Sequence, residues 1–419
     1  FNILQLIENK QVLVVTPEKF LYVLRHAPEL AANVGLAIFD EGHQFDSGNR
    51  GITYELLLTS LRLMLPDDAQ KVLISAVISN ASAVGEWLNG TDSAVVSGTN
   101  LMPTLRSVGF ASWLDKRGRI EYVSDDDIEI GTFFVPRVIE SCELKKKKRE
   151  TKIRVFPDKS IPKDVGKEIA LYLGLKLVSQ GSVAIFCGRK DTASGLCEMI
   201  HEKFSRGLSL PKPIEYSNSK EVAKLYSLHS RNLGAEAPTT KSAQLGIFSH
   251  HGNTPHGIRL AVEYSMREGL IRFVICTSTL AQGVNLPIRY LIVTSIYQGQ
   301  EQIRVRDFHN LIGRAGRAGM HTEGSILFTD PIVYDKRNTW KESWRWGRIK
   351  ALLDPLNSEQ CLSSLFDLIP LTINNDRSMS IDKKEHSLTW DLLPFTSAYI
   401  KGWDALNKVI DQIVRAHGQ

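Results

Sequence analysis

The stretch from Cys276 to Gly319 constrains the fold of this chain more than any other part of the sequence. Three residues typical of β-strands, Phe273–Ile275, run directly into Thr277, and the chain then turns through Gly283. A strand that ends in a polar, glycine-containing loop is the place where an open α/β sheet presents a ligand site. This stretch therefore predicts an α/β protein with a binding site at the strand ends.

A second polar segment lies further along the same stretch and reads Gly313-Arg314-Ala315-Gly316-Arg317. The two arginines are three residues apart, which predicts that they share one face of a helix. The glycines would let that face lie close to a partner. Guanidinium groups held in this way suit the charge that develops on a phosphoryl group during transfer. An arginine pair on a solvated helix is the alternative, and we favour phosphoryl chemistry because the Thr277 loop accompanies it.

Both segments resemble motifs of the superfamily 2 DExH-box helicases, specifically the Ski-two-like branch. TSTLAQGVNLP (277–287) resembles motif V, and IGRAGRAG (312–319) resembles motif VI. The family also has a DExH box and a serine-alanine-threonine motif upstream. The chain supplies Asp40-Glu41-Gly42-His43 and then Ser75-Ala76-Val77.

The resemblance implies a nucleotide site for ATP and Mg²⁺. Asp40 would hold Mg²⁺ largely through water, because magnesium keeps part of its hydration shell. Glu41, a second metal ligand, would orient and deprotonate the attacking water. His43 would sense the γ-phosphate and couple to the second domain. The second half of the chain would add Gly283, Asn285, Asn310, Arg314 and Arg317.

The chain departs from the family pattern at two positions. Val77 stands where the family has threonine, and valine lacks the threonine hydroxyl. A hydrogen bond that links the state of the bound ATP to the binding of nucleic acid in the family would therefore be lost. Asn310 stands where the family has glutamine and is one methylene shorter, which changes its reach toward ATP or His43.

Nucleic-acid contacts are expected from both halves. A strand at Gln11–Val15 is predicted to lead to Thr16, which would cap a helix that starts at Pro17. Such a helix start can hold phosphate, and in the family this segment contacts the sugar-phosphate backbone. A plain helix cap is the alternative interpretation. The contacts implied by the resemblance are Thr16, Pro17, Lys19, Arg189, His251, Thr277 and Ser278.

The predicted fold is two RecA-like parallel-sheet domains followed by a mainly helical accessory segment. Residues 1–106 would be an incomplete first domain with a buried strand at Leu36–Phe39, and residues 164–332 the second domain. Residues 107–163, with opposite charge runs at 125–127 and 145–149, predict a linker or solvated insertion. Residues 333–419 would be a helical or winged-helix region with a helix capped by Ser358.

Two smaller features leave alternatives open. Leu291–Thr294 and Ile303–Val305 flank a turn at 298–300 and predict a hairpin, which could be a duplex wedge or a plain domain edge. The tryptophans at 340, 344 and 346 lie among lysines and arginines. Such residues can stack bases, but packing of a helix against the motor is favoured.

Composition sets the outer limits. A chain of 419 residues with 43% hydrophobic content can form two or three domains with cores. A net charge of +5 is compatible with a DNA or RNA partner, and a protein partner subunit stays open. Five cysteines without a CxxC pair indicate reduced thiols in the cytoplasm. No apolar run has the length of a membrane span.

No GxxxxGK[ST] phosphate loop occurs in the 419 residues. We expect the loop to precede Phe1 in a longer parent protein. The resemblance implies that this parent is an ATP-dependent helicase or translocase of 3′-to-5′ polarity, in repair or in antiphage defence such as Hachiman systems. The alternative is a non-hydrolysing nucleic-acid-binding subunit or scaffold of a defence or repair complex, which Val77, Asn310 and the missing loop favour.

The chain alone is predicted not to hydrolyse ATP at the rate of a motor. Backbone N–H groups and a lysine of the phosphate loop normally hold the β- and γ-phosphates, and this sequence lacks them. The measurement is phosphate release with and without added nucleic acid. Turnover that nucleic acid stimulates would contradict the prediction.

Overall fold

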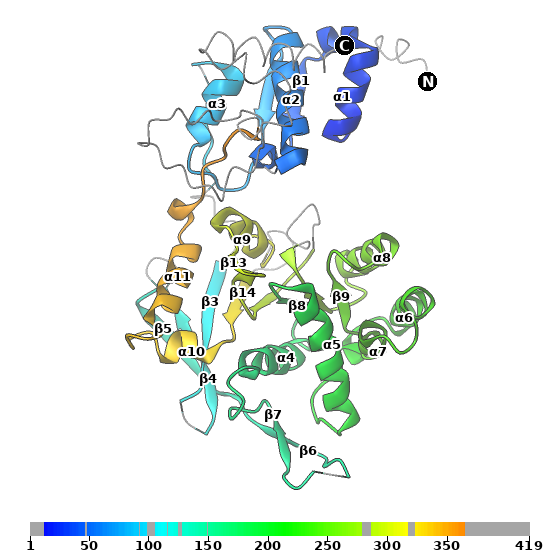
Figure 1. Ribbon diagram of the computed structural model, residues 1–419, viewed down its shortest axis with the longest axis vertical. Coiled ribbons are helices and arrows are strands. Elements are labelled where there is room, and N and C mark those ends of the chain that lie inside the picture. The colour runs from blue at the N-terminus through cyan, green and yellow to red at the C-terminus, as the bar shows by residue number, and fades with distance from the viewer. Residues whose placement is uncertain are drawn as a thin grey trace, which may run out of the picture. The chain divides into compact units, whose positions relative to one another are not determined.

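The computed structural model describes residues 12–364 except 47, 92, 99–104, 115, 125–127, 149, 279–285 and 317–322. The chain forms two compact units (Figure 1). Unit 1 comprises Phe1–Val96 and Glu359–Gln419, and unit 2 comprises Ser97–Ser358. The polypeptide therefore passes from one unit to the other twice.

Unit 1 combines two short parallel strands with helices. Strand β1 (Leu36–Phe39) pairs with β2 (Gln70–Leu73). The helices are α1 (Pro17–His26), η2 (Pro28–Asn33), η3 (Gly42–Asp46), α2 (Gly48–Met64) and α3 (Ala81–Asn89). Leucines of α2 recur at helical spacing and are buried against α1, α3 and β1: Leu57, Leu58 and Leu61. Helix α2 thus contributes to a core that it shares with α1, α3 and β1.

The sheet of unit 1 differs from the sequence prediction. The strand at Leu36–Phe39 forms, but the prediction that it is buried is wrong, because Leu36 and Ile38 are 51% and 59% exposed. The strand predicted at Gln11–Val15 does not form over the described residues 12–15, whose side chains are exposed. A strand needs a neighbour for its backbone hydrogen bonds. Within the described residues, β1 has such a neighbour in β2 alone.

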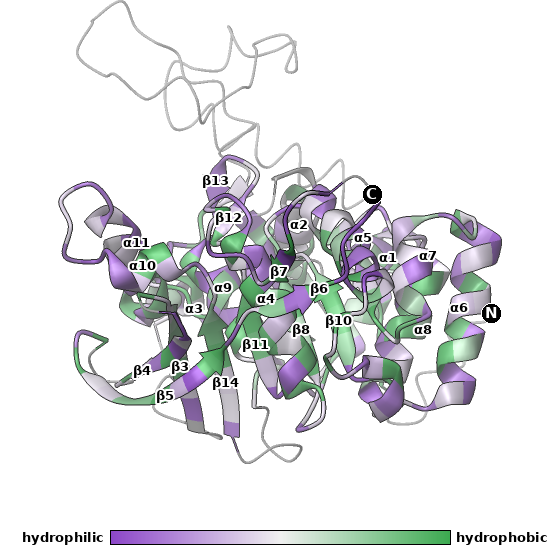
Figure 2. Ribbon diagram, turned by 90° about the horizontal axis from the view of Figure 1, so that it is seen from below, coloured by the Kyte–Doolittle hydropathy of each residue, from purple (hydrophilic) through white to green (hydrophobic). Residues whose placement is uncertain are grey.

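Unit 2 is built on an eight-stranded sheet with the order β5-β4-β3-β14-β11-β8-β10-β9. The pairs from β3 to β9 are parallel, whereas β3, β4 and β5 pair antiparallel. The strands are β3 (Leu105–Ser112), β4 (Gly118–Val123), β5 (Gly131–Ile139), β8 (Val183–Phe186), β9 (Phe248–His250), β10 (Phe273–Cys276), β11 (Tyr290–Val293) and β14 (Glu323–Phe328). Figure 2 shows hydrophobic residues along its central strands.

Helices cover both faces of this sheet. Alternate residues of a strand point to opposite faces: Val183 and Ile185 of β8 pack with α4 (Val165–Leu177) and α5 (Lys190–Ser205). Ala184 and Phe186 belong to the opposite cluster. That cluster includes α6 (Ser219–Leu233), α7 (Pro238–Ala243), α8 (His256–Arg267), α9 (Val305–Ile312) and α11 (Ser343–Leu353). The central strands are continuous apolar runs because both faces are buried.

The prediction of a linker or solvated insertion over 107–163 is wrong. This segment supplies most of β3, all of β4 and β5, and the small sheet of β6 (Cys142–Leu144) and β7 (Arg154–Phe156). Strand β3 pairs with β14 from Leu105 to Phe110. Phe110 is fully buried, with its ring centroid 5.0 Å from that of Phe328 and 4.9 Å from that of Trp346. The charge runs lie outside these strands. Because they interrupt the pattern of apolar residues along the segment, the strands are hard to predict from periodicity.

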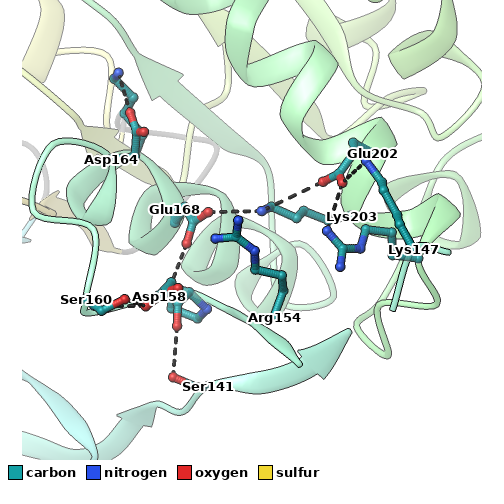
Figure 3. Close-up of polar contacts among 12 residues, drawn as sticks. Ser141, Lys147, Arg154, Asp158, Ser160, Asp164, Glu168, Glu202 and Lys203 are labelled. Atoms are coloured by element: carbon teal, nitrogen blue, oxygen red, sulfur yellow. Dashed lines mark hydrogen bonds and ion pairs between the residues drawn. The ribbon is translucent and has the colours of Figure 1, made fainter. Parts of the chain in front are cut away.

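The described part of the basic run is solvated. Lys145–Lys148 are exposed at the end of β6. The Nζ atom of Lys147 lies 2.8 Å from Glu202 Oε1, and Lys203 Nζ lies 3.1 Å from an oxygen of the buried Glu168 (Figure 3). Lys147 of the basic run therefore pairs with a carboxylate on α5, and Lys203 of α5 pairs with a carboxylate on α4.

The segment after Asp330 packs on unit 2 and then leaves it. Helices α10 (Pro331–Asp335) and α11 are followed by the 3₁₀ helix η6 (Pro355–Asn357). Trp346 is buried, which confirms packing, whereas Trp340 is 91% exposed. The prediction of a helix capped by Ser358 is wrong for 358–363, which form no helix. The rest of that helix and the last predicted helix lie outside the described residues.

The α/β class predicted from the sequence is confirmed: unit 1 has a parallel pair of strands, and unit 2 has a mixed sheet whose strand pairs are mostly parallel. Among the described residues, no helix is long and apolar enough to span a membrane.

Replacing Phe110 tests whether the supposed linker is part of the core of unit 2. Phe110→Ala should lower the free energy of unfolding of unit 2 by about 3–5 kcal/mol, because it removes a buried ring from close packing. Urea unfolding followed by protease cleavage within unit 2 measures it. Leu114→Ala, at a position 65% exposed, is the control and should change stability by less than about 0.5 kcal/mol. Equal effects of the two substitutions would contradict the packing described here.

Candidate functional site

The acidic loop of unit 1 begins where β1 ends. Asp40 is exposed, and its Oδ1 accepts the backbone N–H of Glu41 at 3.0 Å. Glu41 has a φ of +50°, a left-handed conformation that non-glycine residues rarely adopt. The turn at Glu41 lets Gly42–Asp46 start the 3₁₀ helix η3 immediately after the strand. Both carboxylates are thus placed at the carboxyl end of β1.

His43 joins this loop to the Ser75-Ala76 segment. The ring is buried, and its Nδ1 accepts the backbone N–H of Ala76 at 3.2 Å. A neutral ring that accepts at Nδ1 carries its proton on Nε2. That nitrogen lies 3.4 Å from Glu41 Oε2. His43 therefore links the backbone after β2 to the carboxylate of Glu41.

Gly42 lies directly against the side chain of Leu73. A Cβ atom there would lie 2.4 Å from Cγ and Cδ2 of Leu73, the last residue of β2. The Gly42 N–H donates to the carbonyl of Ile74 at 2.7 Å. The loop is therefore held directly against the end of the neighbouring strand.

Tyr54 is a site residue that the sequence analysis missed. Tyr54 lies on helix α2, and its hydroxyl donates a hydrogen bond of 2.9 Å to the carbonyl of Asp40. Burial, together with the carboxylates of Asp40 and Glu41, raises the pKa of Tyr54 to about 12. The tyrosine is thus a neutral hydrogen-bond donor that connects the acidic loop to α2. No local sequence motif identifies Tyr54 as a site residue.

The predicted cap at Thr16 is confirmed. Thr16 Oγ1 accepts the N–H of Lys19 at 3.4 Å, and Pro17 is the first residue of α1. Thr16 and Lys19 are exposed. Glu18 pairs with Arg50 of α2 at 3.1 Å, and hydrogen bonds from its own backbone N–H and from Thr16 and Arg50 lower the pKa of Glu18 against the effect of burial. The cap exists, while its contact with nucleic acid stays a prediction.

Three predicted nucleic-acid residues of unit 2 lie at neighbouring strand ends. Strands β8, β10 and β9 are adjacent and parallel, so Arg189, His251 and Thr277 follow them at the same edge of the sheet. The backbone N–H of Thr277 donates to the carbonyl of His250 at 3.1 Å. Ser278 follows Thr277 and is partly exposed.

Polar contacts fix this edge. Arg189 is exposed and directly precedes α5, while Lys190 Nζ donates to Asn253 Oδ1 at 3.3 Å. His251 is 6% exposed, and burial, with positive charge nearby, lowers the pKa of its ring. Near neutral pH this ring is uncharged, so it can contact a ligand as a neutral hydrogen-bonding group rather than as a cation.

The arginine segment differs from its prediction. Helix α9 ends at Ile312, so the prediction that Arg314 and Arg317 share a helical face is wrong. Gly316 has a φ of +66°, and its N–H donates to the carbonyl of Ile288 at 2.9 Å. A Cβ at Gly316 would lie 2.5 Å from the backbone nitrogen of Gly324. The glycines thus end the helix and let a turn pack against β14.

Not all of the predicted nucleotide residues can be placed. Arg314 lies in this turn and is 7% exposed, and Asn310 lies on α9 and is partly exposed. Gly283, Asn285 and Arg317 lie outside the described residues.

The predicted hairpin between the two motifs is shorter than expected. Leu291–Val293 belongs to the central sheet, and the hairpin consists of β12 (Tyr297–Gln298) and β13 (Glu301–Gln302) around Gly299. A Cβ at Gly188, just past the end of β8, would lie 1.4 Å from the carbonyl oxygen of Tyr297. Gly188 therefore permits backbone contact between the hairpin and the Arg189 segment.

Comparisons with known proteins match segments of both units. The family model "DEAD/DEAH box helicase" matches residues 2–84, and "Helicase conserved C-terminal domain" matches residues 211–319. The first covers the Thr16, Asp40 and Ser75 segments of unit 1. The second covers the His251, Thr277 and Arg314 segments of unit 2.

Three relatives cover most of this chain. The Hachiman protein HamB of Bacillus cereus is 29% identical over 328 residues, which are 77% of this chain and 28% of HamB. The ATP-dependent DNA helicase Hel308 of Methanococcus vannielii is 28% identical over 75% of this chain and 38% of its own length. The human helicase POLQ-like is 27% identical over 76% of this chain and 26% of its own length.

The chain therefore spans between about a quarter and two fifths of these relatives. With both helicase domains matched and these relatives in common, this chain belongs to the Ski-two-like DExH-box helicases of superfamily 2.

Proposed function

We propose that this chain forms the motor region of a longer protein that uses ATP to move 3′ to 5′ along nucleic acid. The observation that carries the proposal is the His43 contact set of unit 1. One imidazole joins a carboxylate of the DExH box, Glu41, to the backbone of the motif that follows β2. Such a link can transmit the state of a bound nucleotide into the protein.

Glu41 is proposed as the general base of ATP hydrolysis. Its carboxylate is 27% exposed, and the His43 ring holds one oxygen on its buried side. The carboxylate can orient an attacking water and accept its proton. Asp40 fits a Mg²⁺ ion held through water, because its exposed carboxylate accepts one hydrogen bond from Glu41 N–H among the described residues. Mg²⁺ would neutralise phosphate charge when bound.

Arg314 and Arg317 are proposed to stabilise the charge on the transferred phosphoryl group. Two fixed glycines, Gly313 and Gly316, surround Arg314 in a turn that is hydrogen-bonded to Ile288. A guanidinium held on such a turn is pre-organised, and arginine contributes a planar fork that lysine lacks. Gly283, Asn285 and Asn310 are proposed to complete the nucleotide site.

The nucleic-acid strand is proposed to contact both units. Unit 1 would use the α1 N-terminus at Thr16 and Pro17, with Lys19, and unit 2 the β8, β9 and β10 strand ends at Arg189, His251, Thr277 and Ser278. Helix N-termini and exposed cations suit phosphate. The name "DNA helicase" of one relative favours DNA over RNA. The Hachiman relative favours antiphage defence over repair.

A second candidate function is a non-hydrolysing nucleic-acid-binding subunit of a defence or repair complex. Val77 and Asn310 favour this candidate. Val77 lacks the hydroxyl of the family's threonine, and the Asn310 side chain is one methylene shorter than the family's glutamine. The ATPase rate of the longer protein with and without nucleic acid separates the two candidates.

Replacing Glu41 in the longer protein tests the general base. Glu41→Gln should lower ATP turnover by about 10²- to 10⁴-fold and leave nucleotide affinity nearly unchanged, because the amide keeps the size and loses the base. Steady-state phosphate release and binding of a fluorescent ATP analogue measure both quantities. Glu86→Gln, at an exposed position on α3, is the control and should retain activity. Near wild-type turnover in Glu41→Gln would remove Glu41 from the role of base.

Replacing Thr277 tests the coupling between nucleic acid and hydrolysis. Thr277→Ala should weaken activation by nucleic acid roughly tenfold, as expected for one lost hydrogen bond, and spare basal hydrolysis. The measurement is the nucleic-acid concentration that gives half-maximal ATPase. Thr339→Ala, at an exposed turn of unit 2, is the matched control. An equal loss of basal and stimulated rates would mean that Thr277 does not couple the two activities.

A further inference from the structure

Residues 359–364 form a short segment that belongs to unit 1 although it follows unit 2 in the sequence. We call this segment the strap. It comes directly after η6 and is the last described part of the chain, at the orange end of the coloured ribbon (Figure 1). It has no helical structure up to Ser363.

Asn80 holds the strap by its backbone. The Asn80 side chain donates from Nδ2 to the carbonyl of Cys361 at 2.9 Å and accepts the Cys361 N–H on Oδ1, also at 2.9 Å. One amide thus satisfies both backbone groups of a buried residue, as a neighbouring strand would. The Ser79 N–H also donates to the carbonyl of Glu359 at 3.4 Å. These bonds explain why a helix does not form here.

The strap in turn holds the DExH loop. Cys361 Sγ donates to the carbonyl of His43 at 3.1 Å, and Ser364 Oγ donates to the carbonyl of Phe45 at 2.6 Å. Both carbonyls belong to η3, a helix so short that most of its carbonyls have no partner within it. Ser363 Oγ donates to Glu55 on α2. The strap therefore bridges η3 and α2.

The packing at Gly51 shows how closely these three parts meet. A Cβ at Gly51 of α2 would lie 2.5 Å from the carbonyl oxygen of Phe45 and 2.5 Å from Ser364 Oγ. Cys361 is 3% exposed and belongs to the apolar cluster that contains Phe45 and Leu58. The strap is thus part of the core against which the DExH loop rests.

We propose that the strap is a positioning element of the DExH loop, with Asn80, Cys361 and Ser364 as its positioning residues. The strap fixes η3 through two carbonyls, η3 fixes the His43 ring, and His43 fixes Glu41. ATP hydrolysis then depends on a segment that lies more than 270 residues after the catalytic box, between unit 2 and whatever follows Ser364. The catalytic part of this inference rests on the proposed function.

Asn80→Ala and its control test the inference. Asn89→Ala is the matched control, because Asn89 is the last residue of α3, the helix that Asn80 precedes, and its side chain donates one hydrogen bond, to the carbonyl of Lys71 at 3.2 Å. Hydrogen exchange of the peptide that contains Gly42–Asp46 is the first readout and needs no ATPase activity. Asn80→Ala should speed that exchange about tenfold or more, as expected for the loss of one to two hydrogen bonds. Asn89→Ala should leave it unchanged.

The second readout is steady-state ATP hydrolysis by the longer protein. Asn80→Ala should lower kcat about tenfold or more and change KM for ATP by less than about threefold, because the strap orients the base without touching nucleotide. Ser364→Ala, which keeps the Asn80 bonds, should reproduce both effects at smaller size and covers the case in which Asn80→Ala fails to fold.

The outcomes are distinguishable. Unchanged exchange at Gly42–Asp46 in both strap variants overturns the inference, and so does faster exchange with unchanged kcat. If the wild-type protein proves not to hydrolyse ATP, the proposed function fails and the catalytic part of the inference falls with it. The exchange measurement then still decides whether the strap holds the loop.

Discussion

Parallel pairing of strands is the constraint on which both units depend. Neighbouring parallel strands end at the same edge of a sheet, so loops that are far apart in the sequence meet there. In unit 1 this brings His43, which follows β1, into contact with Ala76, which follows β2. In unit 2 it aligns Arg189, His251 and Thr277 after β8, β9 and β10. The proposed site residues that the structure describes lie mostly at these two edges.

The two edges are stabilised in different ways. Unit 2 buries its sheet between helices on both faces, so a thick apolar core positions its loops. The described part of unit 1 has two strands, and polar contacts contribute more to holding its loop in place. Gly42 packs on Leu73, His43 accepts from Ala76, and Tyr54 donates to Asp40. These contacts fix the backbone of the loop, which suits the proposed role of its carboxylates.

The errors of the sequence analysis have physical causes. Strand β3 precedes two charge runs, and its partner on one side is β14, which lies more than 200 residues later in the sequence. The arginine spacing fits a helix, but Gly313 and Gly316 end that helix and the turn is stabilised by Ile288 and Gly324. Leu36 and Ile38 look like core residues, yet within the described chain their exposure depends on which neighbours cover β1. Local pattern carries no information about such neighbours.

The sequence by itself determined the local chemistry: the DEGH box after a strand, the Thr16 cap, the TSTLAQGVNLP loop and the helicase family that they indicate. These are properties of residues close together in the chain, where turn geometry and residue type decide. Only the tertiary structure decided what supports that chemistry. Asn80 is hydrogen-bonded to Cys361, 281 residues away, and Cys361 to His43, 318 residues away. Hydrogen bonds between such distant residues form because the fold brings the residues together, and no local spacing in the sequence encodes them.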